Sequence, residues 1–248
     1  MPGAVPSPFS IAVAGEARVD DLSFRQEDIL GVEIRDRRFT ACTFQDCDFE
    51  GSRFVACEFL DCRFASSKFR EAKFIGCKFG SGGDSRPISW RFCDLSQALF
   101  EDCGLSNNLI DKGKAFETSF VRCACLGLKF DAEVHRHIGK QLLVGSVRFR
   151  DCRMQFAAFA QANYEASVFE SCDLRDVDFS RGNYTRVSFR GSVLHNADFT
   201  GATLDEADLS GATFDSFPLA EVFSFHGLVV GRDQQAAMLA SIGIRVAG

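Results

Sequence analysis

The chain contains eleven cysteines, which could form disulfides, bind a metal or act as nucleophiles. A structural zinc site would need close pairs such as C-x-x-C with a matching pair elsewhere in the chain. The sequence contains no C-x-x-C, and Cys123 and Cys125, separated by one residue, are a poor substitute. An odd number of cysteines without an export signal also argues against a disulfide framework. We therefore expect reduced thiols that pack in a core, and no metal site.

Two histidines, His135 and His137, could also bind a metal or transfer protons. Either role would need an acidic or thiol partner in a fixed geometry, so a solvated loop is the preferred interpretation. The motifs G-x-S-x-G, H-E-x-x-H and the P-loop are absent from the sequence. The run GSGGDS at residues 80–85 lacks the lysine and the following helix of a phosphate-binding loop. The sequence therefore predicts no enzyme and no cofactor.

Phenylalanine recurs at every fifth residue, and 27 of the 30 aromatic residues are phenylalanine. Nine stand in succession from Phe39 to Phe79, and the residue two positions before each is small except for the first, Arg37. Because residues two apart in an extended segment lie on one face, both point inward. Cys125 takes the large inward position. The other ten cysteines take the small one: Cys42, Cys47, Cys57, Cys62, Cys77, Cys93, Cys103, Cys123, Cys152 and Cys172.

The repeat is interrupted twice. The first excursion, about residues 80–89, adds six residues to a pentad step and is rich in Gly and Ser. The second, about residues 131–146, adds fourteen residues to a step. After it the period holds without a gap from Phe149 to Phe214.

A chain that turns a corner every five residues must wind into a solenoid. Its coils stack through backbone hydrogen bonds about 4.8 Å apart. Each buried phenylalanine then contributes roughly 1.5 to 3 kcal/mol. The period alone leaves open whether three or four faces close a coil. A filled interior leaves no substrate pocket along the rod.

The charge of the chain is uneven. The net charge of −6 argues against nucleic-acid binding driven by phosphate contacts. Between Gly191 and Gly231 there is no lysine or arginine, whereas the rest of the chain balances at 28 charges of each sign. This pattern indicates a solubilised solenoid end or a local mimic of DNA. The six acids are Asp198, Asp205, Glu206, Asp208, Asp215 and Glu221.

The sequence also bears on where the protein works. No apolar stretch approaches the roughly 20 residues that a membrane span needs. The first basic residue is Arg18, so the N-terminus lacks the positive region of a signal peptide. We expect a cytoplasmic protein without membrane contact.

The last part of the chain, residues 219–248, departs from the repeat. Residues 227–231 predict a strand, Asp233 a helix cap and Gly243 the end of a short helix that runs through Ala240. The end of a solenoid exposes a sheet edge and apolar core, which repeat proteins cap or pair across a two-fold axis. We expect a homodimer whose interface contains Leu228, Val229, Met238, Leu239 and Ile242.

Three consecutive pentads, Ala197–Gly201, Ala202–Glu206 and Ala207–Gly211, resemble the A(D/N)LxX repeat of pentapeptide-repeat proteins. The resemblance covers nearly all of residues 19–218. It implies an all-β fold, a right-handed quadrilateral parallel β-helix with four pentads per coil. We expect two loop excursions and a short C-terminal helix on this framework. Residues 1–18 form an N-terminal extension before it.

Within this family the chain resembles the Qnr and MfpA branch, which binds DNA gyrase and topoisomerase IV and protects them from quinolones or natural poisons. The resemblance rests on the segment Phe74–Phe79 with its excursion, on the longer second excursion, and on Gln235–Val246 at the end. It implies partner contacts by the acidic coils and the loops. A scaffold or effector module without a topoisomerase role is the alternative. The implied contact residues are Asp198, Asp205, Glu206, Asp208 and Asp215 in the coils, and Asp84, Arg86, His135, Arg136, His137 and Lys140 in the loops.

Overall fold

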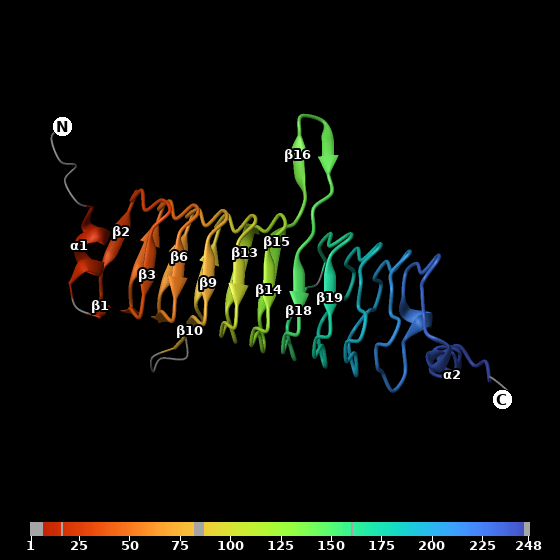
Figure 1. The fold of residues 1–248 in the computed structure, drawn as a ribbon. Helices are drawn as coiled ribbons and strands as arrows, with labels where there is room; N and C mark the ends of the chain where they lie inside the picture. Colours follow the sequence, from red (N-terminus) through yellow and green to blue (C-terminus); the bar gives the residue numbers. More distant parts are fainter. Residues whose placement is uncertain (1–6, 16, 82–86, 160, 246–248) are drawn as a thin grey trace.

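The computed structural model describes residues 7–15, 17–81, 87–159 and 161–245. They wind into a straight rod with the two ends of the chain at opposite ends (Figure 1). The rod is a right-handed parallel β-helix, which confirms the predicted fold class. None of the helices in these ranges is long and apolar enough to cross a membrane.

Short parallel strands form the walls of the rod, and we number the four faces in chain order. The first face holds β1 (Arg18–Asp20), β4 (Arg38–Thr40), β7 (Glu58–Leu60) and β10 (Lys78–Gly80). The second holds β2 (Ser23–Arg25), β5 (Thr43–Gln45), β8 (Arg63–Ala65), β11 (Ser89–Arg91), β13 (Leu109–Lys114) and β15 (Lys129–Glu133). The third is built from isolated bridges such as Asp28–Asp48 and Asp48–Lys68. The fourth holds β3 (Glu33–Arg35), β6 (Arg53–Val55), β9 (Lys73–Ile75), β12 (Leu99–Glu101), β14 (Ser119–Val121), β18 (Arg148–Arg150) and β19 (Val168–Glu170).

One coil contains four pentads. Phe39 pairs with Phe59 and Phe59 with Phe79, twenty residues apart each time, which settles the choice between three and four faces. The residue that follows many strands has a positive φ, which turns the chain at the corner; Asp21 (56°) and Gly76 (61°) are examples. Asp tolerates this left-handed conformation better than most residues, and Gly has no Cβ to clash.

The two excursions differ in how far they depart from the coil. Phe64 pairs with Trp90, twenty-six residues later, so the first adds six residues as predicted. Phe120 pairs with Phe149, twenty-nine residues later, so the second adds nine residues to a coil. The sequence analysis counted one pentad step across this excursion and so obtained fourteen extra residues. The chain makes two pentad steps there, which leaves nine. The intervening core position is filled by Val134, which is fully buried.

Stacked rings fill the N-terminal part of the core. Phe59 and Phe79 lie nearly parallel with ring centroids 4.9 Å apart, and Phe54 meets Phe59 edge-on at 5.7 Å. Both arrangements are favoured by aromatic quadrupoles. All eleven cysteines are free and buried, which confirms their inward position in the pentads.

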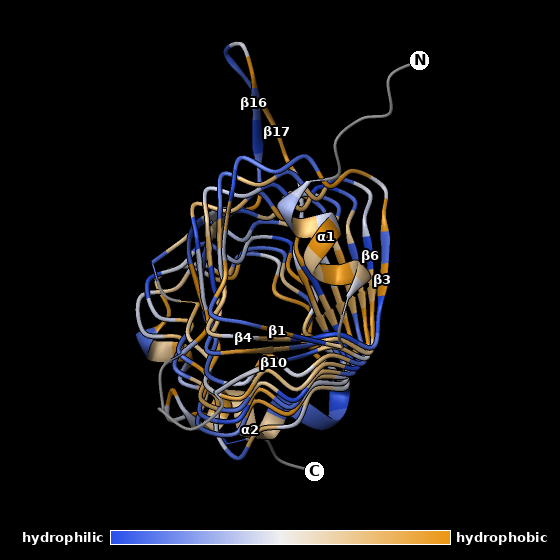
Figure 2. Ribbon diagram, turned by 90° about the vertical axis from the view of Figure 1, so that its left-hand side faces the viewer, coloured by the Kyte–Doolittle hydropathy of each residue, from blue (hydrophilic) through white to orange (hydrophobic). Residues whose placement is uncertain are grey.

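A short helix closes the N-terminal end of the rod. Helix α1 (Pro8–Ala14) begins after Ser7, whose hydroxyl accepts a hydrogen bond from the Ser10 N–H. It buries Phe9 against the rings of Phe24, Phe39, Phe44 and Phe49. Figure 2 looks onto this end and shows α1 lying across it. Part of the N-terminal extension is therefore a lid on the core.

The C-terminal end is closed by irregular turns and a second helix. These elements are η1 (Leu219–Glu221), η2 (Arg232–Gln234) and α2 (Gln235–Ala240). The predicted strand at 227–231 is wrong, because this segment forms only a single bridge between Val229 and Asp208. Asp233 lies inside η2 and does not cap α2. Gly243, with φ of 81°, ends the helical segment as predicted.

Candidate interaction surfaces

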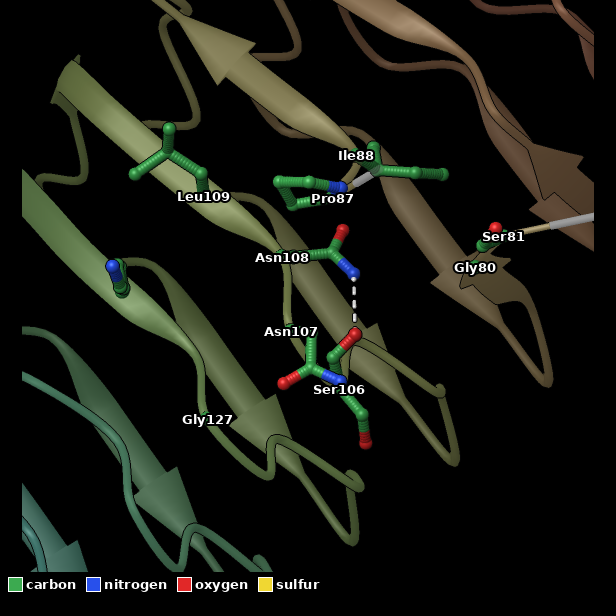
Figure 3. A pocket seen from close by; sticks show the side chains of 10 residues that line it. Gly80, Ser81, Pro87, Ile88, Ser106, Asn107, Asn108, Leu109 and Gly127 are labelled. Carbon is green, nitrogen blue, oxygen red and sulfur yellow. Dashed lines mark hydrogen bonds between the residues drawn. The ribbon is translucent and has the colours of Figure 1, made fainter. Parts of the chain in front are cut away.

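The described residues form surface hollows beside both excursions; the one at the root of the second, about 490 Å³, is lined by polar residues that include Asp94, Glu133 and His135. One hollow of about 350 Å³ lies beside the first excursion, between Gly80, Ile88 and Asn107 (Figure 3). Its polar floor is used by the fold: the Asn108 amide donates to the carbonyls of Phe79 (3.0 Å) and Ser106 (3.2 Å). The Asn108 side-chain oxygen accepts from the Trp90 indole at 3.1 Å. In the described part of the chain, no group of three or more His, Cys, Asp or Glu residues could hold a metal ion.

Two of the predicted loop contacts, Asp84 and Arg86, fall in residues 82–86, outside the described residues. The structure therefore does not place these two predicted contacts. The second excursion contains the other four predicted loop residues.

The second excursion forms a β-hairpin that stands off the rod (Figure 1). Strands β16 (Arg136–Ile138) and β17 (Gln141–Leu143) pair antiparallel, with His137 opposite Leu142. The sequence analysis predicted a solvated loop here and did not predict the paired strands. The hairpin exposes large apolar side chains to solvent, and 65% of Ile138 is accessible. The other exposed apolar residues are Leu142, Leu143 and Val144.

The root of the hairpin is packed tightly against the rod. The Arg136 guanidinium lies over the Phe116 ring, 4.4 Å from its centroid. The Gly145 N–H donates to Nδ1 of His135 at 3.1 Å. A Cβ on Gly145 would come within 2.3 Å of the Val134 carbonyl oxygen and 2.4 Å of the Phe116 ring, so this position requires glycine. These contacts fix how the hairpin leaves the rod.

The four predicted loop contacts therefore divide into two groups. His135 is only 7% exposed and holds the root, which corrects its assignment as a partner contact. Arg136 is half-buried over Phe116. His137 and Lys140 lie exposed on the projecting part, where a partner could reach them. Burial at the root could not be read from the sequence, because it depends on Phe116 from the preceding coil.

The acidic residues of the last coils surround the rod instead of lining one face. Bridges place Asp198 on the second face and Asp208 on the fourth. Asp205 lies on the third face, two residues after Thr203. Glu206 occupies the corner that follows, with φ of 57°. Asp215 follows Thr213 of the first face.

Most of these carboxylates are oriented by neighbouring groups. Asp205 accepts from the Ser224 hydroxyl (2.6 Å) and the His226 N–H (2.7 Å). The Ser224 hydrogen bond, followed by that from His226, lowers the pKa of Asp205. Asp215 pairs with Nδ1 of His195 at 2.9 Å. Asp205 and Asp215 thus both have histidine partners.

Apolar side chains gather at the C-terminal end, but not all the predicted ones. Met238 is buried in its own chain, so it is unavailable to an interface. Leu228 and Leu239 are half-buried, and Val229 and Ile242 are exposed. The sequence analysis missed three further exposed apolar residues at this end. They are Phe223, which is 80% accessible, Phe225 and Ile244.

Part of the repeat matches a known family model. The model described as pentapeptide repeats matches eight copies, over residues 40–80 and 185–216. These two segments are pentapeptide repeats. No curated protein matches the chain by sequence.

Two structures of one protein share the fold of this chain, and a third solved structure is less similar. Full-length QnrB1, a plasmid-mediated fluoroquinolone resistance protein, shares 18% identity at a TM-score of 0.72, covering 90% of this chain and 100% of QnrB1. A trypsin-treated QnrB1 gives 18% identity and a TM-score of 0.70, covering 93% and 99%. HetL from Nostoc, involved in heterocyst differentiation, is more distant, at 13% identity and a TM-score of 0.43, covering 87% and 90%. At these identities the likeness to QnrB1 shows a shared fold.

Proposed function

We propose that this protein binds a type II DNA topoisomerase, gyrase or topoisomerase IV, and protects it from quinolones or natural topoisomerase poisons. The observation that carries the proposal is the apolar β-hairpin held at a fixed angle on a rigid rod. Exposed Ile138, Leu142 and Leu143 are unfavourable in water, and a protein partner would bury them. The likeness in fold to a fluoroquinolone resistance protein directs the choice of partner.

The acidic coils supply the second contact in this proposal. Double-stranded DNA carries a charge about every 1.7 Å, and these coils carry six acids without lysine or arginine. Their carboxylates surround the rod, as phosphates surround a duplex. They are suited to a basic DNA-binding surface over a short length, so the mimicry is partial. The same negative charge disfavours direct binding of nucleic acid.

The proposal requires neither catalysis nor a cofactor. The protein acts by occupying a surface of its partner. The encounter with a topoisomerase takes place in the cytoplasm.

We also propose that the C-terminal end forms a homodimer. Phe223 and Phe225 lie on the last coil, and Val229 and Ile242 lie near the end of the chain, so an apolar surface remains uncovered there. Pairing this end with a second copy would bury these side chains symmetrically. Sedimentation of the full chain and of Phe223→Ser/Ile242→Ser tests this, and a wild-type monomer at micromolar concentration would refute it.

A supercoiling assay with gyrase and ciprofloxacin tests the function. Wild type is expected to restore supercoiling, and Ile138→Ser/Leu142→Ser is expected to fold normally but lose the rescue. Ile11→Ser is the matched control, because Ile11 is as exposed but lies on α1 at the far end. Absence of binding and of rescue with both topoisomerases, for every poison tested, would favour the scaffold alternative.

A further inference from the structure

Six of the buried cysteines form one continuous column along the first face of the rod. The residue after each cysteine donates its backbone N–H to the carbonyl of the cysteine one coil earlier. Examples are Lys78 to Cys57 (2.9 Å) and Ala124 to Cys103 (2.9 Å). The backbone N–H of Cys123 lies 3.4 Å from the sulfur of Cys152. In order, the column contains Cys57, Cys77, Cys103, Cys123, Cys152 and Cys172.

The thiols in this column follow one another at intervals of one coil, from Cys57 through Cys77 to Cys103 and on to Cys172. Each thiol also reaches a backbone carbonyl; Cys103 donates to the Phe74 oxygen at 3.3 Å. Of the remaining cysteines, Cys42 and Cys62 form one further pair in adjacent coils, on the second face, where the Arg63 N–H donates to the Cys42 carbonyl at 2.9 Å. Cys47 and Cys93 have no cysteine neighbour of this kind. Cys47 has Ser67 as its neighbour one coil later, and Cys93 lies between Ser67 and Gly113.

The coil spacing determines what could join two neighbouring sulfurs. Rings stacked on the fourth face are 4.9 Å apart for Phe54 and Phe74, and 4.8 Å for Phe100 and Phe120. A disulfide needs Cβ atoms about 3.5 to 4.5 Å apart, which parallel strands in register do not allow without backbone movement. Two metal–sulfur bonds of about 2.3 Å placed end to end span about 4.6 Å, which fits one coil.

We propose that the thiol column binds monovalent thiophilic cations such as Cu(I), each held in linear two-coordinate geometry between cysteines of adjacent coils. Soft thiolates favour such ions over harder metals. Zinc is excluded from the column, because it needs four ligands in a tetrahedron and one column presents two sulfurs per gap.

The burial of the column determines the charge of the bound state. A cation that forms two metal–sulfur bonds and displaces one S–H proton leaves one thiolate, one thiol and one positive charge, so the site is neutral. Displacing both protons would leave a net negative charge in the core, which is costly. The released proton passes to solvent.

Silver(I) is the probe for this site, since it shares the charge and linear geometry of Cu(I). The full reduced chain is exposed to Ag(I) in chloride-free, anaerobic buffer, both as folded protein and during refolding from urea. Native mass spectrometry then counts bound silver and lost protons. We expect several silver ions per chain, each replacing one proton, and no retained zinc under the same treatment.

Paired variants separate the column from cysteines in general. Cys77→Ser/Cys123→Ser removes four of the five neighbouring pairs, whereas Cys47→Ser/Cys93→Ser removes none of them. Serine is tolerated in the column, because Ser192 follows Cys172 there and donates to the Phe169 carbonyl at 2.8 Å. Retained silver should fall more than twofold in the first variant and stay unchanged in the second. Equal retention in the two variants, zinc retention, or no silver after either treatment would overturn the proposal.

Discussion

The N-terminal and C-terminal coils are built on the same pentad but use their outer positions differently. In the N-terminal coils charges pair between neighbouring coils: Glu58 contacts Arg38 at 2.6 Å and Lys78 at 3.3 Å. In the last coils the segment Gly191–Gly231 contains no lysine or arginine, and Asp208 reaches a basic side chain only outside it, Arg190 at 3.7 Å. Their cores differ as well, with stacked phenylalanines in the first and mainly leucine and alanine in the second. The comparison indicates that one end provides rigidity and the other presents charge.

The largest effect should come from the phenylalanine core. Phe59→Ala is expected to lower the free energy of unfolding by about 3 to 5 kcal/mol, through lost burial and a cavity between Phe39 and Phe79. Arg63→Ala, at an exposed position of the same coil, should cost under about 0.5 kcal/mol. Urea unfolding measures both, and equal costs would contradict the role given to the rings.

A smaller loss is expected at the C-terminal cap. The buried Gln234 amide donates to the carbonyls of Leu209 (2.7 Å) and Ala212 (2.6 Å). Gln234→Ala removes the donor of the Ala212 carbonyl, whereas the Leu209 carbonyl keeps the Ala212 N–H, and should cost about 1 to 3 kcal/mol. The exposed neighbour Gln235 is the matched control, and its change to Ala should cost under about 0.5 kcal/mol. If the two variants melt alike, the polar cap does not stabilise this end.

The unequal charges of the two ends can be tested in binding to gyrase. Neutralising Asp198, Asp205 and Asp208 to Asn should weaken binding about tenfold at low salt and less at high salt, where charges are screened. The control neutralises three exposed acids of the N-terminal coils, Asp21, Asp36 and Asp46. Titration calorimetry at two salt concentrations measures both triple variants. Similar losses would show that only net charge matters.

The smallest effect concerns pH. The pKa of Asp205 is lowered in the folded state by its hydrogen bonds from Ser224 and His226. The ionised carboxylate therefore favours folding above the usual carboxyl pKa, and this contribution is lost as pH falls through the lowered value. Asp205→Asn should flatten the acid limb of a stability–pH curve slightly. An NMR titration that finds an ordinary pKa for Asp205 would contradict this.

The periodicity of the sequence predicted most of the fold. Spacing alone placed Phe59 and Cys57 inward, because an alternating extended segment allows no other arrangement. The number of faces required pairing between coils, which the period does not contain. The lid formed by Phe9 was missed because a single aromatic residue in a short helix carries no periodic signal.

The candidate surfaces were harder to predict than the core. The hairpin order depends on long-range contacts of Arg136 with Phe116 and of Gly145 with His135. Phe223 lies outside the pentad register, so the repeat gives no indication of its exposure. The phenylalanines at 223 and 225 are two residues apart, which departs from the five-residue period. This spacing was the feature of the sequence that indicated the end of the pentad register.

Helix α1 also determines how copies of this protein can assemble. A parallel solenoid has two different ends, and a bare top coil of one copy could stack on the bottom coil of the next to form an open fibre. Phe9 covers the core section at the first end and removes that surface. Association through the other end must then join two identical surfaces, and such an assembly closes at two copies. The burial of the Phe9 ring therefore favours a closed assembly over an open filament.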